Sequence, residues 1–192
     1  MSGLGTSDLN LTVNVPAGTG DWFGSWEGDR TPEPDRYATA DASAGRMVEM
    51  IERGQPAVML CHWPGMYCNG TKIGFHAFQR VVTSLNRKYG NVTQWMKLSE
   101  MARYWAVKEL ATITTGQNSI AIDSPFACPQ FTIKVAQPVV SATVLAIGER
   151  TTLFKTSGMK LDSGTFSRDG QTATLCFDVQ RGKQHIELAL AQ

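Results

Sequence analysis

The stretch 56–70, PAVMLCHWPGMYCNG, holds the side chains of this 192-residue chain that are best suited to chemistry. An apolar run at 57–61 reads as a short buried strand, and His62, Trp63 and a Pro-Gly turn follow it directly. The end of such a strand commonly displays working side chains, because the sheet holds the backbone while the loop exposes the group. His62 is therefore the candidate catalytic residue, and Trp63 is a candidate substrate contact beside it.

Metal binding is the first alternative for this stretch. Cys61, His62, Cys68 and His76 are thiol and imidazole ligands of the kind that a tetrahedral zinc site uses. The spacing argues against zinc, since structural zinc ligands usually come in closely spaced pairs and neighbours on a strand point to opposite faces. We predict no metal ligands in this chain and expect the cysteines to be reduced thiols, mostly in the core.

A second group of candidates lies near the amino terminus, in the run DWFGSWEGDR. Trp22, Trp26, Asp29 and Arg30 are the residues predicted to bind substrate there. Sugar-binding clefts combine a flat aromatic face with polar groups beside it, which is the combination found in this run. The alternative is a loop that its tryptophans hold against the domain.

The elements that must position these residues change character near residue 115. Before it, apolar residues recur at helical spacing in 39–53, 71–89 and 99–111, and short apolar segments at 57–61 and 91–96 read as strands. Helices that alternate with strands over short connections are typical of a parallel sheet. The first part is therefore predicted to be α/β, as the closing βα units of a parallel sheet or barrel.

Beyond this point apolar residues alternate with polar ones, as in QFTIKV, ATLCFDV and HIELAL. About seven short strands with turn signals between them predict an all-β antiparallel sandwich. The last three segments read as a hairpin meander, with Asp-Gly and Arg-Gly turns. The predicted domains are 1–114, a partial α/β domain with a loop-rich start, and 117–192, a β-sandwich.

Composition excludes several classes of partner. Eighteen basic and seventeen acidic residues are spread without runs, for a net charge of +1, so nucleic acid is not a predicted partner. No apolar stretch approaches the roughly 20 residues that span a bilayer, and the start has no signal-peptide pattern, which predicts a soluble chain without a membrane partner. Neither a Walker loop nor a GxGxxG follows a strand, so nucleotide binding is not predicted.

The run from residue 56 to residue 110 resembles the last βα units of the polysaccharide deacetylase family. Those units have an apolar strand ending in Leu-x-His, a crossover helix, a short strand and a final helix, and the match here is Leu60-Cys61-His62. The histidine at this position of the family lies in the active site and acts as general acid in amide or ester cleavage. The resemblance, which covers residues 37–111, implies that role for His62.

This sequence also departs from the family's pattern. The family holds a divalent metal, expected to be zinc, with an aspartate and two histidines from N-terminal motifs, and a second aspartate acts as base. This sequence contains no Asp-Asp pair, no His-x-x-x-His and three histidines in all. The resemblance therefore implies that the catalytic, metal-binding half is missing, that this chain holds no cofactor, and that hydrolysis requires the missing half.

Three functional hypotheses follow from these observations. The chain is the C-terminal portion of a deacetylase-like carbohydrate-active protein that is not hydrolytic on its own; or it is a carbohydrate-binding module; or it is a structural accessory module that packs on a larger α/β partner. The candidate partners are a carbohydrate, a second copy of the chain and that larger protein.

Overall fold

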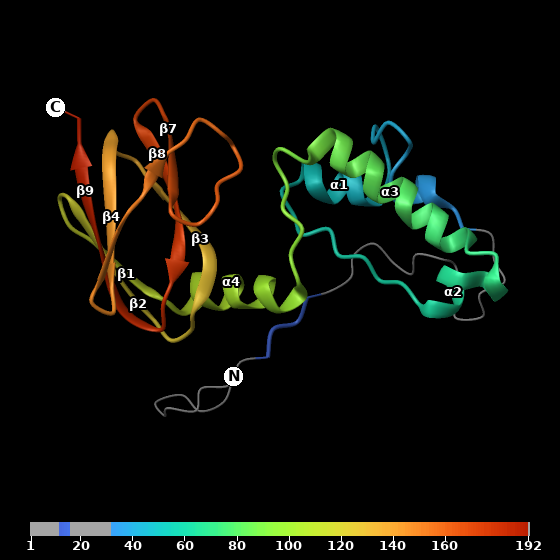
Figure 1. Cartoon of the computed structure of the whole chain (residues 1–192), viewed down its shortest axis with the longest axis horizontal. Helices are drawn as coiled ribbons and strands as arrows, with labels where there is room; N and C mark the ends of the chain where they lie inside the picture. Colours follow the sequence, from blue (N-terminus) through green and yellow to red (C-terminus); the bar gives the residue numbers. More distant parts are fainter. Residues whose placement is uncertain (1–11, 16–31, 192) are drawn as a thin grey trace. The chain divides into compact units, whose positions relative to one another are not determined.

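The structure is a computed structural model that describes residues 12–15 and 32–191. The chain divides into two compact units, which can be followed by label in Figure 1. The helical unit comprises the described residues of 15–94. The β unit comprises those of 12–14 and 95–191.

The helical unit is built from one long helix and several short ones around a small core. Its elements are η1 (Pro34–Arg36), α1 (Arg46–Glu52), α2 (Trp63–Tyr67), η2 (Cys68–Gly70) and α3 (Ile73–Tyr89). The long helix α3 contributes Val81, Leu85 and Tyr89 to this core, and α1 contributes Met47 and Val48. In α3 these residues recur four positions apart, and in α1 Ile51, one turn after Met47 and Val48, packs against the same core, so each helix has one side that can be buried.

Helix α1 begins later than the sequence predicts, at Arg46. Gly45 precedes it with φ 120°, and a Cβ there would lie 2.5 Å from the backbone carbonyl of Tyr37. Asp41, within the predicted helix range, accepts hydrogen bonds from the Thr39 hydroxyl (2.7 Å) and from the backbone N–H and hydroxyl of Ser43. These bonds, the Thr39 bond foremost, lower the pKa of Asp41 to about 2. The residues predicted as the first turns of the helix therefore form a closed polar turn.

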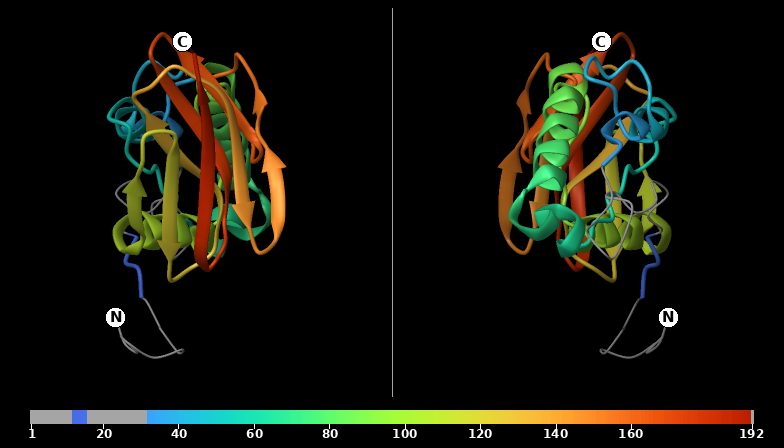
Figure 2. Two further views of the ribbon diagram at one scale, coloured as in Figure 1. Left: turned by 90° about the vertical axis from the view of Figure 1, so that its left-hand side faces the viewer. Right: turned by 90° about the vertical axis from the view of Figure 1, so that its right-hand side faces the viewer.

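The β unit consists of helix α4 (Leu98–Leu110) and two sheets (Figures 1 and 2). One sheet has the order β1-β2-β9-β4-β5 and the other β3-β8-β7-β6. All neighbouring strands are antiparallel except β6 and β7. The strands are β1 (Thr112–Thr115), β2 (Ser119–Ser124), β3 (Cys128–Val135), β4 (Val139–Ala146), β5 (Glu149–Thr152), β6 (Phe154–Lys155), β7 (Thr165–Asp169), β8 (Thr172–Val179) and β9 (Gly182–Leu190).

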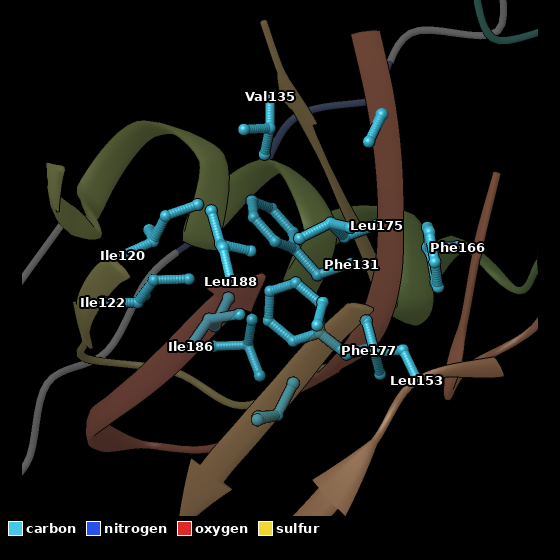
Figure 3. Close-up of a cluster of buried hydrophobic side chains, with 14 of the residues drawn as sticks. Ile120, Ile122, Phe131, Val135, Leu153, Phe166, Leu175, Phe177, Ile186 and Leu188 are labelled. Carbon is cyan, nitrogen blue, oxygen red and sulfur yellow. The ribbon is translucent and has the colours of Figure 1, made fainter. Parts of the chain in front are cut away.

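The two sheets face each other across one hydrophobic core, shown in Figure 3. Ile122 and Ile186 enter it from one sheet and Leu175 and Phe177 from the other. Alternate residues of each strand point inward, which is why the period of two in the sequence becomes a shared apolar layer. Helix α4 adds Val107, which is fully buried in the same core.

The predicted fold class, an α/β part with closing βα units of a parallel sheet or barrel before an antiparallel sandwich, is wrong. In the part of the chain that the structure describes, the two sheets are mostly antiparallel and belong to the β unit, and the helical unit contributes no strand to them. The segments 57–61 and 91–96, predicted as strands, form none: the first has no regular structure apart from a single bridge residue, Leu60, and the second is turn and coil. Two short segments cannot supply the neighbours that a parallel sheet requires. Helix α4, predicted as the last helix of the α/β part, belongs to the β unit. The sequence boundary between the helical unit and this part of the β unit therefore falls between Gln94 and Trp95.

Candidate functional site

His62 and Trp63 lie at the start of helix α2, in the helical unit. His62 is the N-cap residue, with extended backbone angles (φ −108°, ψ 144°), and Trp63 is the first helical residue. Pro64 favours the helix start at this point, because its fixed φ suits the first turn. The His62 side chain is half-buried. The histidine therefore lies at a helix start and not at the end of a sheet strand.

The aromatic pair of Trp63 and Tyr67 is the most prominent feature of this region. The two rings lie one helical turn apart and are stacked, with centroids 5.5 Å apart and planes inclined by 17°. Their exposed fractions are 71% for Trp63 and 49% for Tyr67. Large aromatic side chains that stay exposed while stacked on each other present apolar surface toward solvent.

Helix α2 is held against the start of α3 by a close backbone approach. A Cβ on Gly74 would collide with the carbonyl oxygen of Gly65, so α3 cannot carry a larger residue at position 74 without moving. Cys68 ends α2 in the left-handed conformation, and its buried thiol lies 2.9 Å from the same carbonyl oxygen. The Thr71 hydroxyl donates to the Cys68 carbonyl (2.8 Å). These contacts fix the helix that carries the aromatic pair.

Three further apolar side chains of the same stretch are half-exposed, namely Leu60, Ile73 and Phe75. The Phe75 ring stacks on Phe78 of the next helical turn, with centroids 6.5 Å apart. It also lies 6.2 Å from the imidazole of His76, at an angle of 59°. The region from Leu60 to His76 thus exposes more apolar surface than its helices require for their own packing.

The predicted metal alternative involved the thiols and imidazoles of this stretch. Cys61 is exposed, whereas Cys68 is buried in the α2–α3 contact. Among the residues that the structure describes, no group of three or more His, Cys, Asp and Glu side chains is placed to hold a metal ion. The third histidine, His185, lies on strand β9 of the β unit.

The other predicted binding residues, Trp22, Trp26, Asp29 and Arg30, lie outside the described residues. Nothing in the structure brings them to the aromatic pair or separates them from it.

Sequence reasoning missed Tyr67. Its signal was available, since residues four apart on a helix lie side by side and Trp63 is four positions before it. The Pro64-Gly65 pair after His62 predicts a turn, and helical spacing is not expected within a turn. Pro64 instead occupies the first helical turn, where it loses no hydrogen bond.

A polar cluster between α1 and α3 holds the helical unit together. The Tyr89 hydroxyl donates to the Glu52 carboxylate at 2.5 Å, and the Lys88 ammonium lies 3.6 Å from the same carboxylate. The hydrogen bond from Tyr89 lowers the pKa of Glu52, with the positive charge of Lys88 adding to it. Burial raises the pKa of Tyr89, and the bond to Glu52 raises it further. The cluster joins the ends of two helices and is structural.

Comparisons of this chain with protein-family models, with curated proteins and with solved structures found no match. None of the helices in the described part of the chain has the length and apolar character needed to span a bilayer.

Proposed function

We propose that this chain is a carbohydrate-binding part of a deacetylase-like carbohydrate-active protein and is not hydrolytic on its own. The observation that supports it best is the exposed, stacked pair of Trp63 and Tyr67 beside His62. A flat aromatic face stacks on the apolar face of a sugar ring, and neighbouring polar groups bind the hydroxyls. The aromatic pair supplies such a face on a helix that is fixed by its contact with α3.

The resemblance to polysaccharide deacetylases supports a sugar as the ligand. The residues that carry it, Leu60-Cys61-His62, lead directly into the helix that bears the aromatic pair. In the family the corresponding histidine lies in the active site, and in this proposal His62 is a polar contact at the edge of the aromatic face. Amide or ester hydrolysis needs an activated water, and the proposal assigns this chain no group that activates one.

A structural accessory role is the second candidate, and the aliphatic neighbours of the pair favour it. Leu60 and Ile73, which precede and follow the aromatic pair in the sequence, are exposed, and aliphatic side chains gain more from burial against a protein than against a hydrated sugar. In that case the same stretch packs on a larger partner.

The test is depletion of the full chain from solution by insoluble chitin, cellulose and xylan. The proposal expects binding to at least one of them and about tenfold weaker binding for Trp63→Ala, equivalent to about 1.4 kcal/mol. Trp105→Ala is the matched control, because Trp105 is a 50% exposed tryptophan on α4 of the other unit. Equal loss in both variants, or no binding to any polysaccharide, contradicts carbohydrate binding and favours the accessory role.

The hydrolytic part is tested by acetate release from acetylated chitooligosaccharide and acetylated xylan, with and without added zinc. We expect no release above buffer. Metal-dependent release that disappears in His62→Ala would show that the chain contains a complete site.

A further inference from the structure

The two sheets of the β unit have four edges, and three of them carry features that prevent pairing with other chains. Exposed edge strands are usually blocked by charges, proline, bulges or shortness. Strand β5 carries Glu149 and Arg150, β3 contains Pro129 and a register shift between residues 128 and 131, and β6 is two residues long. Strand β1, with the sequence TITT, contains no charge, no proline and no register shift, and is exposed along its whole length.

The hairpin register identifies the backbone groups that β1 directs away from its sheet. The Gly116 N–H donates to the Ser119 carbonyl at 2.8 Å, which makes this pair hydrogen-bonded. Hydrogen-bonded and non-hydrogen-bonded pairs alternate along an antiparallel ladder. The next hydrogen-bonded pair is therefore Thr114 with Ala121, and the backbone N–H and C=O of Thr114 point toward β2. Ile113 and Thr115 therefore point their N–H and C=O groups outward.

Strand β9, on the other side of β2, leads to the same assignment. The Leu188 N–H donates to the Asn118 carbonyl at 2.9 Å, so even-numbered residues of β2 bond to β9. Odd-numbered residues of β2 bond to β1, and they lie opposite Thr112 and Thr114.

One side chain of β1, that of Ile113, also extends the apolar face of the sheet beyond the buried core. Ile113 lies opposite Ile122, whose side chain is buried in the core, so both occupy the core-facing side of the sheet. Yet Ile113 is 46% exposed. A further strand at this edge would cover it.

We propose that β1 pairs antiparallel with β1 of a second copy of this chain, about a two-fold axis at Thr114. In this register Ile113 of one copy lies opposite Thr115 of the other, and each such pair exchanges two backbone hydrogen bonds. The two copies of Thr114 face each other at the axis. The two five-stranded sheets then form one continuous sheet.

A second copy fits this edge better than an unrelated extended peptide. Peptides that add to a sheet edge gain affinity from pockets for alternate side chains as well as from backbone bonds, and β1 is four residues long. A two-fold pairing uses the same backbone groups twice and brings together β-branched residues, which pack well across antiparallel strands. Because β1 has no charge, the two identical strands do not repel each other.

Sedimentation velocity of the full chain over a wide concentration range tests the proposal. We expect a reversible dimer that both Thr114→Lys and Thr114→Glu weaken by about tenfold or more, because like charges then face each other across the axis. An equimolar mixture of these two variants should recover the dimer, since unlike charges then meet. Circular dichroism checks that each variant is folded.

Two controls separate this interface from others. Thr112→Lys places the same charge on the same strand, but opposite Gly116 of the second copy, so its dimer should persist. Trp63→Ala should leave the dimer unchanged, because that side chain belongs to the helical unit. A wild-type chain that stays monomeric at every concentration overturns the proposal, as does a dimer that survives both Thr114 variants or fails to recover in their mixture.

Discussion

The four cysteines differ in exposure and therefore in reactivity. Cys128 and Cys176 are buried in the four-stranded sheet, and burial raises the pKa of each thiol to about 11, with the negative charge of Asp178 adding to it. Thiolate is the reactive form of cysteine. Both thiols are therefore unreactive for two reasons: reagents cannot reach them in the fold, and their raised pKa leaves little thiolate at neutral pH. Cys61, at the other extreme, is exposed. The other three thiols are buried, which agrees with the prediction of thiols that lie mostly in the core.

Alkylation of the native chain at pH 8 should modify Cys61 first and leave Cys128 and Cys176 unmodified until the protein unfolds. Peptide mass spectrometry over time measures this order, and Cys61→Ser should remove the fast phase. Because the folded state raises both buried pKa values above the ordinary value of 9.0, these thiols stabilise the fold below that pH. Their contribution is lost as the pH rises through about 11. Early modification of Cys128 would contradict its burial.

At the scale of elements, the position of the aromatic pair depends on the contact between α2 and α3. Gly65 and Gly74 meet backbone to backbone, and α2 is only five residues long. A helix of that length has no stability of its own and persists through tertiary packing. The binding face is therefore only as well ordered as this contact.

Gly74→Ala should separate the two helices and lower the free energy of unfolding of the helical unit by about 1–3 kcal/mol, the usual cost of overpacking. Polysaccharide binding should weaken with it, since the aromatic pair loses its support. Gly54→Ala is the control, because Gly54 has φ +65° and open space around its Cβ position. That change should cost about 1 kcal/mol of backbone strain and leave binding unaffected. Urea unfolding and the depletion assay measure the two effects.

At the scale of the whole molecule, α4 is part of the β unit. Its Tyr104 ring lies 5.1 Å from that of Phe131, and the Tyr104 hydroxyl is hydrogen-bonded to that of Thr132 at 2.7 Å. Val107 completes the core between the sheets. A sandwich that began at residue 117 would lack Tyr104, Val107 and the whole of β1.

A fragment of residues 95–192 should therefore unfold cooperatively, whereas one of residues 117–192 should be much less stable. Loss of Val107 alone costs about 2 kcal/mol of buried apolar side chain, and the shorter fragment also exposes Phe131 and the β2 edge. Thermal unfolding followed by circular dichroism compares the two fragments. Equal stability would mean that α4 only lies against the sheets.

The sequence alone determined most local structure. The alternation of apolar residues located strands β2, β3, β4, β7, β8 and β9. The helical spacing of apolar residues located α3 and α4. The sequence also identified His62 and Trp63 as neighbours at the start of a turn-rich segment. These properties depend on residues close in the chain, so periodicity and turn residues are sufficient to find them.

Only the tertiary structure decided which elements belong together. The run at 151–156 reads as one strand, but Leu153 crosses from one sheet to the other and divides it into β5 and β6. The last three segments read as a meander, yet β9 leaves β8 and inserts between β2 and β4. The exposure of Tyr67 and the burial of Val107 likewise depend on how the elements pack, and not on the local sequence. Period-two patterning shows that a strand has an apolar face but not which sheet that face will meet, because the choice depends on contacts between residues far apart in the chain.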